Sequence, residues 1–295
     1  MSDSFLLPRP AFIPCFAQFH KFKNTRIGLT GHRGLLGTIL TERLSRHHIF
    51  WEAFPGDITD ASALEEWFST RRFDFFFHLA ARVSVPMVDQ APVAAFETNA
   101  VGAFNVCSQI LKTCPQSWFF LASSSHVYQT RRQPLRVGDS EAPSTFYGAS
   151  KLAAEKLVMP LFEKCGGSAC AGRIFSFTHS TQKSPYLVPA LQEKIGRLQE
   201  GDTLEVTNAL SMRDIMDAEV VIDAILHLAA RRWKGVTNIA SGIGITVGDV
   251  AERVARRQGK AVKIAVRQES PPDALVADVS TLRSLLSGPD CFQSQ

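Results

Sequence analysis

Short apolar runs alternate with longer amphipathic stretches along most of the chain after Asn24. This alternation is typical of repeated βα units that build a parallel sheet. Up to residue 175 it predicts strands and then helices over these ranges: 26–30, 48–54, 74–80, 118–123 and 169–175 for strands, and 35–46, 61–69, 93–112 and 145–163 for helices. The order indicates an α/β fold with a doubly wound parallel sheet, a Rossmann domain over 26–175.

The two flanking parts of the chain follow other patterns. After residue 175 the rhythm loosens, with helices predicted at 188–199, 218–230 and 247–258 joined by short strands. We interpret 176–295 as a smaller substrate-binding region, partly woven back into the sheet. Residues 1–25 contain two short apolar runs, Phe5-Leu6-Leu7 and Ala11-Phe12-Ile13, but prolines interrupt them and no basic start precedes them, so a signal peptide is not indicated. They are expected to form an extension that packs on the outside or stays mobile.

Composition narrows the class of protein. The chain has 295 residues, of which 45% are hydrophobic and 20% charged, which suits a globular protein with a sizeable core. The net charge of +4 comes from scattered basic pairs, so nucleic-acid binding is not indicated. No run approaches the roughly 20 apolar residues that span a bilayer. Six cysteines at irregular spacings, without a CxxC pair, predict reduced thiols, no metal site and a cytoplasmic location.

A glycine-rich loop lies between the first predicted strand and the first predicted helix. Its sequence is Gly31-His32-Arg33-Gly34-Leu35-Leu36-Gly37. Glycines at this spacing let the backbone approach a pyrophosphate, and the helix N-terminus supplies amide donors to it. We therefore predict that Gly31, Arg33, Gly34, Leu35, Leu36 and Gly37 hold a nicotinamide dinucleotide. The alternative is a tight strand-to-helix turn with no ligand.

The second predicted strand bears on which dinucleotide is bound. Enzymes that prefer NAD usually place a carboxylate at the end of this strand, where it accepts from the ribose hydroxyls. Here Glu52 lies inside the strand and no carboxylate ends it, while Arg33 in the loop could pair with a 2′-phosphate. NADP(H) is favoured, and NAD(H) with a solvated Arg33 is the alternative.

Two further segments carry candidate chemistry. Tyr147 and Lys151 are four residues apart in a predicted helix and so share one face. A neighbouring ammonium favours the phenolate, so Lys151 should make Tyr147 a usable acid and base. Ser123, Ser124 and Ser125 end an apolar strand at the edge where doubly wound sheets bind ligands. One hydroxyl there could donate to a substrate oxygen, while another merely caps the turn.

Together these residues resemble the extended short-chain dehydrogenase/reductases of the nucleotide-sugar epimerase/dehydratase family. The likeness covers nearly all of the chain after residue 25. Beside the glycine loop it rests on Asp57-Ile58, His78-Leu79-Ala80-Ala81, Asn99, Ser124, Tyr147, Lys151, Arg173 and Met212-Arg213-Asp214.

The resemblance implies a role for each matched residue. Asp57 and Ile58 would contact the adenine, and Ala80 and Ala81 would line the cofactor. Ser124, Tyr147 and Lys151 would form the catalytic group, because Ser124 stands four residues before Tyr128 as the family pattern requires. The substrate would meet Ser124, Ser125, His126, Ser176, Tyr186 and Arg213, with Arg213 on its phosphates.

Departures from subgroup patterns narrow the reaction. The 4,6-dehydratases carry Asp-Glu after the catalytic hydroxyl, where this chain has Ser125-His126, so dehydration is disfavoured. The loop Gly31-His32-Arg33-Gly34 is similar to that of GDP-fucose synthase, but that enzyme's extra Cys and His are replaced by His126 and Tyr186. The stretch from Arg173 to Leu191, followed by Arg213-Asp214, is similar to GDP-4-keto-6-deoxy-mannose reductases. Their usual Asn-x-x-Gly-Pro is absent at 176–180.

These observations lead to three functional hypotheses. The first is an NADP(H)-dependent reductase of a nucleotide-linked 4-keto-6-deoxyhexose. The second is a nucleotide-sugar 4-epimerase with a retained NAD. The third is a non-enzymatic dinucleotide-sensing protein that keeps the fold. The resemblance also implies a homodimer that pairs through helices at 93–112 and 145–163.

Overall fold

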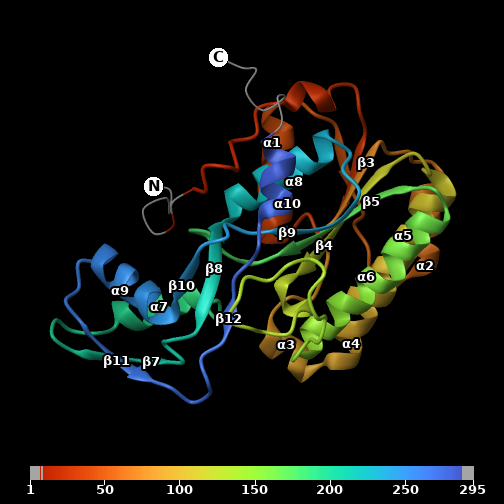
Figure 1. Ribbon diagram of the computed structural model, residues 1–295. Coiled ribbons are helices and arrows are strands. Elements are labelled where there is room, and N and C mark those ends of the chain that lie inside the picture. The colour runs from red at the N-terminus through yellow and green to blue at the C-terminus, as the bar shows by residue number, and fades with distance from the viewer. Residues whose placement is uncertain (1–6, 8, 288–295) are drawn as a thin grey trace.

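The computed structural model describes residues 7 and 9–287, and Figure 1 shows their arrangement. The central sheet has six strands in the order β2-β1-β3-β4-β5-β9, and all five pairings are parallel. Its strands are β1 (Ile27–Thr30), β2 (Trp51–Ala53), β3 (Phe75–His78), β4 (Trp118–Ser124), β5 (Ser168–Ile174) and β9 (Gly235–Ile239). The strand order reverses beside β1, so the prediction of a doubly wound sheet is confirmed.

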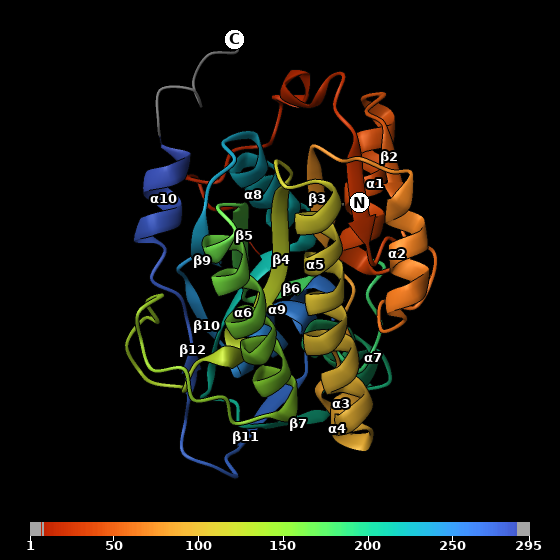
Figure 2. The same cartoon turned by 90° about the vertical axis from the view of Figure 1, so that its right-hand side faces the viewer.

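Helices cover both faces of this sheet (Figure 2). One face carries α2 (Ala61–Ser69), α5 (Ala103–Thr113) and α6 (Phe146–Lys164), and the other carries α1 (Leu35–Arg46), α8 (Ala218–Ala230) and α10 (Ser280–Leu286). Consecutive strand residues point to opposite faces. Phe75 and Phe77 accordingly join one core and Phe76 the other. Burial on both faces explains why these strands are unbroken apolar runs.

The helix predicted over 93–112 is wrong in one detail, because the observed segment changes its winding. It consists of α4 (Pro92–Phe96), the π-helical stretch η3 (Glu97–Gly102) and α5, preceded by α3 (Val85–Gln90). Asn99 lies in the π-helical stretch, where single wide turns often accompany functional sites. The second strand is also shorter than the predicted 48–54, since only Trp51–Ala53 pairs with β1.

The C-terminal region forms a second, smaller unit of sheet and helix. Strand β8 (Met212–Asp217) pairs with β6 (Ser176–Thr178), β10 (Gly244–Thr246) and β12 (Ala274–Leu275). Beside it, β7 (Thr203–Thr207) pairs with β11 (Lys263–Arg267), and α7 (Leu187–Gly196) packs on α9 (Val247–Arg257). Strand β9 and helices α8 and α10 return to the main sheet, so this half of the chain is woven between both units.

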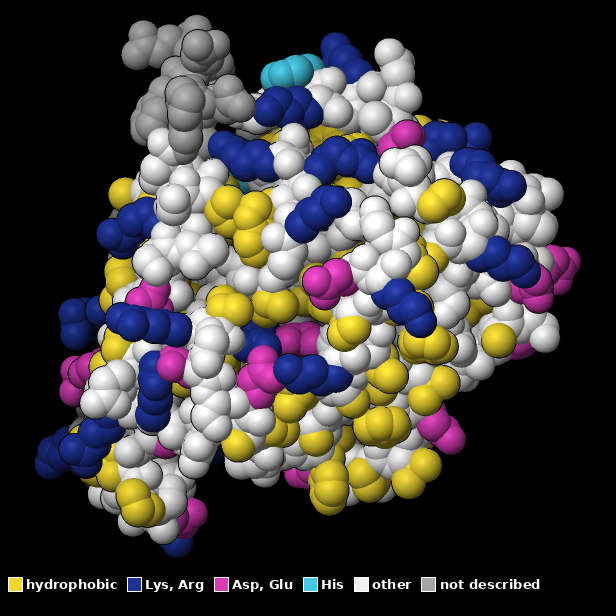
Figure 3. Space-filling model, turned by 45° about the vertical axis from the view of Figure 1, so that its right-hand side comes forward, with side chains coloured by type: hydrophobic (Ala, Val, Ile, Leu, Met, Phe, Trp, Pro, Cys, Tyr) yellow, Lys and Arg dark blue, Asp and Glu magenta, His cyan; other side chains and the backbone are white. Residues whose placement is uncertain are grey.

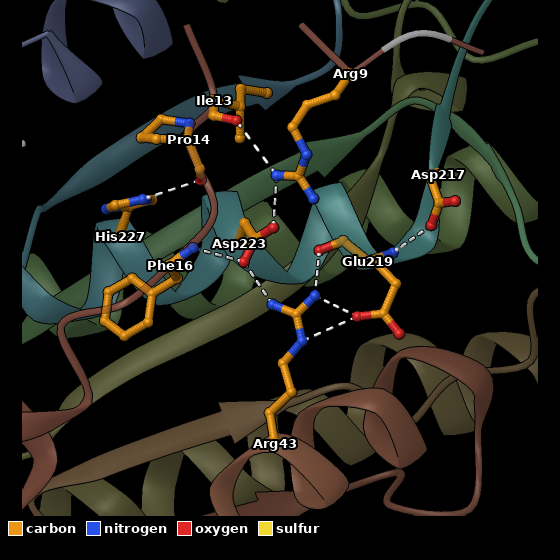
Figure 4. Close-up of polar contacts among 9 residues, drawn as sticks. All are labelled: Arg9, Ile13, Pro14, Phe16, Arg43, Asp217, Glu219, Asp223 and His227. Atoms are coloured by element: carbon orange, nitrogen blue, oxygen red, sulfur yellow. Dashed lines mark hydrogen bonds and ion pairs between the residues drawn. The ribbon is translucent and has the colours of Figure 1, made fainter. Parts of the chain in front are cut away.

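The N-terminal segment packs over α1 and α8, and its aromatic side chains enter the core. Ile13 and three phenylalanines are buried, namely Phe16 together with Phe19 and Phe22 of the short 3-10 helix η2 (Phe19–Phe22). Asp223 of α8 accepts from Arg9 Nη1 at 2.7 Å, from the Phe16 amide at 2.8 Å and from Arg43 Nη1 at 2.5 Å (Figure 4). The described part of the extension is therefore built into the domain, while residues 1–6 and 8 lie outside the described residues.

Three observations bear on the class of protein. Every helix within residues 7 and 9–287 is too short or too polar to span a bilayer. Over the same residues, His, Cys, Asp and Glu form no cluster that could hold a metal ion. Five cysteines are free thiols, and Cys291 lies outside the described residues.

Candidate active site

The glycine loop makes a tight turn at the carboxyl end of β1. Gly31 has φ +78°, and a Cβ there would lie 2.5 Å from the Ala80 amide nitrogen at the end of β3. A side chain at position 37 would collide with the Gly31 carbonyl. Gly34 caps α1 without a side-chain hydrogen bond from any described residue, so the first amides of the helix face the loop. This geometry fits a pyrophosphate, which would accept hydrogen bonds from these amides and be attracted by the positive end of the helix dipole.

The residues expected near the adenine differ in accessibility. Asp57 is exposed, and its carboxylate accepts from the Thr59 amide at 2.9 Å and the Thr59 hydroxyl at 2.8 Å, which lowers the pKa of Asp57. Ile58 is buried in the core, and a Cβ at Gly102 would press against its side chain. Its side chain therefore packs the fold, and only its backbone could meet an adenine. Arg33 is exposed and has no ion-pair partner among the described residues.

The predicted catalytic residues come together where β4 ends and α6 begins. Thr145 caps α6 by accepting from the Gly148 amide at 3.0 Å. Gly148 packs so closely on the His126 carbonyl that any side chain there would collide with it. This contact joins α6 to the 3-10 turn η4 (Ser125–Val127), and the Ser124 hydroxyl hydrogen-bonds to Tyr147. The structure thus brings Ser124, Tyr147 and Lys151 together on one cavity, the three residues that the resemblance groups.

Burial decides the ionisation of this group. It raises the pKa of Tyr147 to about 12, and the hydrogen bond with Ser124 only partly offsets it. The expectation of a lowered tyrosine pKa is therefore wrong for the protein alone, because desolvation of the phenolate is the largest effect on it. Burial also lowers the pKa of Lys151 to about 8, against the opposing effect of Glu155. Near neutral pH, Tyr147 is a protonated donor beside an ammonium.

His126 stands beside this pair. Its ring meets the Tyr147 ring edge-on, with 5.5 Å between the centroids. Burial, and then the charge of Arg213, lower the pKa of His126, so the imidazole is neutral at pH 7. The neutral His126 imidazole can therefore exchange a proton with a ligand bound beside Tyr147.

An open cavity of about 220 Å³ begins at this group and extends to β6 and α7. Its lining consists of Leu36, Leu79, Ala81, Val83, Ala122, Ser123, Ser124, Ser125, His126, Tyr147, Lys151, Ile174, Phe175, Ser176, Phe177, Gln182, Tyr186, Leu187, Val188 and Ile215. The expected substrate residues Ser125, His126, Ser176 and Tyr186 are all part of this lining. Phe177 and Gln182 were missed, because nothing in their sequence context distinguishes them from loop residues.

Arg213 and Ala80 are not part of the cavity lining, and neither are the glycine-loop residues Gly31, Arg33, Gly34, Leu35 and Gly37 or the expected adenine residues Asp57 and Ile58. Arg213 pairs with Asp273, with Nη1 to Oδ1 at 3.0 Å and Nη2 to Oδ2 at 3.4 Å. Ala80 supports the loop, because its backbone touches Gly31. Asp273 is 60 residues from Arg213 in the chain, so no sequence signal could have paired them.

Asn99 holds the segment after β3 against α6. Its side chain accepts from the Arg82 amide at 2.7 Å and donates to the Arg82 carbonyl and the Ser150 hydroxyl, both at 2.9 Å. Ser150 precedes Lys151, so this amide fixes the distance between the cofactor side of the sheet and the catalytic helix.

A doubly wound fold with a glycine loop at β1 and a Ser/Tyr/Lys group at the end of β4 defines a dinucleotide-binding enzyme. The profile of the NAD dependent epimerase/dehydratase family matches residues 27–240, and the chain belongs to this family. The resemblance drawn from the sequence motifs is confirmed, as is the assignment to NAD(P)-dependent enzymes.

Individual relatives are distant. The chain is 26% identical over 241 residues to a GDP-6-deoxy-D-mannose reductase of Pseudomonas aeruginosa, covering 78% of this chain and 79% of the relative. It is 25% identical over 256 residues to a UDP-glucose 4-epimerase of Halalkalibacterium halodurans, covering 79% and 76%.

Two solved structures of similar fold contain different dinucleotides. RMD from Pseudomonas aeruginosa complexed with NADPH superposes with a TM-score of 0.80 at 23% identity, covering 89% of this chain and 92% of that one. The Thermus thermophilus UDP-glucose 4-epimerase in complex with NAD gives 0.75 at 21% identity, covering 88% and 92%. At these identities the likeness shows the fold.

Proposed function

We propose that this protein is an NADP(H)-dependent reductase of a nucleotide-linked 4-keto-6-deoxyhexose. The observation that carries the proposal is the buried Ser124–Tyr147–Lys151 group at the base of the cavity, with Tyr147 protonated beside a lysine ammonium. A protonated phenol is the form that a ketone reduction needs, because the oxygen of the product alcohol must receive a proton.

Each residue of the group then has a distinct task. When bound, NADPH supplies the hydride that reduces the ketone carbon. Tyr147 donates its proton to the ketone oxygen, and the Ser124 hydroxyl donates a hydrogen bond to the same oxygen. Lys151 stabilises the phenolate that remains, and its ammonium would also hold the ribose next to the nicotinamide.

The cavity wall suits a sugar. Hydroxyls and a neutral imidazole are offered by Ser125, His126, Ser176 and Tyr186, while the apolar part of the lining matches a deoxygenated carbon. We assign the diphosphate to Arg213, which lies close enough to His126 to lower its pKa. Asp273 already pairs with this guanidinium, so the phosphates would have to compete with that carboxylate.

The cofactor proposal rests on Arg33. Its guanidinium is exposed at the loop that would cradle the pyrophosphate and pairs with no carboxylate of the described chain, so it is available to a 2′-phosphate. The Pseudomonas aeruginosa structure of similar fold holds NADPH. NAD(H) is the alternative, since the Thermus thermophilus epimerase of similar fold holds NAD.

One observation favours a second function, a nucleotide-sugar 4-epimerase. Several curated relatives at 23–26% identity are UDP-glucose 4-epimerases. The same three residues could oxidise C4 and reduce it again with a retained NAD. The third hypothesis, a dinucleotide sensor without turnover, is less favoured because Ser124, Tyr147 and Lys151 are all in place.

We also propose a homodimer that pairs through α3 to α6. Apolar side chains gather on this surface (Figure 3). Its exposed members are Met87, Val93, Phe96, Val101, Phe104, Phe146 and Leu157. An apolar patch of this kind marks an association surface. Light scattering on Phe104→Glu should give a monomer where the wild-type chain gives a dimer, and a wild-type monomer at micromolar concentration would refute the proposal.

The first experiment follows NADPH absorbance when the protein meets GDP- and dTDP-linked 4-keto-6-deoxyhexoses generated in the same tube, with NADH in parallel. Oxidation with one of them would support the reductase and identify its nucleotide. Interconversion of simple sugar nucleotides by protein that carries bound NAD, with no oxidation in either assay, would overturn it in favour of the epimerase. Cofactor binding without turnover of any nucleotide sugar would favour the sensor.

A further inference from the structure

A buried carboxylate lies one helical turn beyond the catalytic lysine. Tyr147, Lys151 and Glu155 are spaced by four residues along α6, so their side chains follow one another on the face that packs on the sheet. Lys151 is 2% exposed and Glu155 is 3% exposed. A buried carboxylate is costly unless it is paired and hydrogen-bonded, so its partners indicate why it is tolerated here.

Glu155 is held by two adjacent strands of the sheet, β4 and β5. Arg173 of β5 donates Nε to both carboxylate oxygens, at 3.0 and 3.2 Å, and Nη2 to Oε2 at 2.7 Å. The Ser123 hydroxyl of β4 donates to Oε1. Ser123 and Arg173 are register partners, and Ser123 precedes the catalytic hydroxyl of Ser124. The carboxylate therefore fixes α6 against the strand end that carries Ser124.

Arg173 extends the network into the loop that leads to Tyr147. It donates Nη1 to the Val137 carbonyl at 3.2 Å and Nη2 to the Glu141 carboxylate. Its guanidinium lies 4.7 Å from the centre of the Tyr128 ring, and the Tyr128 hydroxyl donates to Asn238 Oδ1 at 2.6 Å. One arginine thus joins β5, α6 and the loop before the catalytic tyrosine.

We propose that Glu155 is a positioning residue whose negative charge keeps Lys151 in its ammonium form. Arg173, by pairing with the same carboxylate, sets how strongly that charge acts on Lys151. This inference deepens the proposed function and rests on the role assigned there to Lys151. It gives the Glu155–Arg173 pair a task in the reaction besides its task in packing.

The surroundings of Lys151 explain why this charge matters. The titratable groups that face it are Tyr147 and Glu155 on α6 and His78 on β3, with His126 of η4 beyond the Tyr147 ring. Burial lowers the pKa of His78 to about 3, and Tyr147 keeps its proton, so neither carries a charge near neutral pH. Glu155 then supplies the negative charge that opposes desolvation of the ammonium.

The direction of the effect follows from the sign of each charge. Catalysis of reduction needs Lys151 protonated, so activity should fall as pH rises through the pKa of Lys151, which is about 8. In Glu155→Gln the ammonium loses its counter-charge, and the alkaline limb of the kcat profile should move to lower pH by about one unit. In Arg173→Gln the guanidinium no longer offsets the negative charge of Glu155, so the alkaline limb of the kcat profile should move to higher pH.

The matched control is Glu163→Gln, the same chemical change on the exposed side of the same helix, which should leave the limb in place. A buried variant can fail to fold, so Glu141→Gln is included, since Glu141 is only partly buried. Without the Glu141 carboxylate, the positive charge of Arg173 offsets the Glu155 carboxylate more completely. The alkaline limb should then move to lower pH, by less than in Glu155→Gln. A loss of packing alone would lower kcat at every pH without moving the limb.

A second readout does not depend on turnover. The rate at which an amine-reactive anhydride labels Lys151 across a pH series that brackets its pKa, followed by peptide mass spectrometry, reports its ionisation. Glu155→Gln should make Lys151 reactive at lower pH, and Arg173→Gln at higher pH. An unchanged labelling curve in folded Glu155→Gln or Glu141→Gln protein would overturn the inference and leave the reductase standing. Turnover retained by Tyr147→Phe would instead overturn the proposed function, whatever the labelling shows.

Discussion

Each face of the sheet buries a carboxylate that is paired with arginine, and the two carboxylates serve different purposes. On the α6 face, Glu155 is bound by Arg173 and lies one turn from Lys151. On the opposite face, Asp223 of α8 is bound by Arg43 of α1 and by Arg9 of the N-terminal segment (Figure 4). Both carboxylates are almost completely buried and both are fully paired.

The difference lies in what surrounds each pair. Glu155 lies one turn from Lys151, and its negative charge acts on the lysine that we propose takes part in the reaction. Asp223 joins three segments that are far apart in the sequence, and the groups around it are Arg43, Glu219, Arg9 and the Phe16 amide. Changes at the α8 face should therefore alter folding stability, and changes at the α6 face should alter the chemistry.

The largest effect on the α6 face should come from Tyr147→Phe. Without the phenol no group donates the proton, and kcat should fall by about 10²- to 10⁴-fold, the range typical of a lost general acid. Binding of NADPH, measured by fluorescence titration, should change little because the glycine loop is intact. A variant that turns over at the wild-type rate would show that the acid is another residue, with His126 the first to test.

The largest effect on the α8 face should come from Asp223→Ala. The change leaves Arg43 partly unpaired and frees the Phe16 amide, so the free energy of unfolding should fall by about 3–5 kcal/mol. Urea denaturation measures it, with the exposed Asp89→Ala as the matched control. The pH profile of kcat should stay where it is. A shifted profile would mean that the two faces are coupled.

A smaller effect is expected at the glycine loop between β1 and α1. Arg33→Ser removes the charged donor proposed for the 2′-phosphate, and such a hydrogen bond contributes about 1.5–3 kcal/mol. The Kd of NADPH should therefore rise by roughly 10- to 100-fold while the Kd of NADH stays constant. Equal losses for both cofactors would indicate that Arg33 supports the loop and does not read the phosphate.

The smallest effect concerns His227 on the α8 face. Its Nε2 lies 3.3 Å from the Pro14 carbonyl, and burial lowers its pKa in the folded chain. The unfolded chain, with a histidine pKa of about 6.5, then binds the proton more readily, so this contribution to stability is complete above that pH and is lost as pH falls below it. His227→Gln should remove part of the stability loss that acidification through this pKa causes. Thermal melts of the wild-type protein, of His227→Gln and of the exposed His20→Gln control, each above and below this pH, would measure the loss. An equal acid-induced loss of stability in all three proteins would refute the assignment.

The motifs were predictable because local spacing carries them. Phe75, Phe76 and Phe77 alternate between the two faces of the sheet, and Tyr147 and Lys151 are four residues apart on one helix. Both features need only the geometry of a single strand or helix. The glycine loop likewise follows from a strand, a turn and a helix. From these elements alone the sheet class, the family and the Ser124–Tyr147–Lys151 group could be predicted.

Contacts between distant segments could not be predicted, and they set the electrostatics. Asp273 pairs with Arg213, Arg173 with Glu155, and Arg9 with Asp223, across separations that leave no periodic trace in the chain. The tyrosine pKa was misjudged for the same reason, because its lysine neighbour is visible in the sequence and its desolvation is not. Local geometry is written in short-range patterns of residue type, whereas burial and charge pairing depend on what the folded chain places around each group.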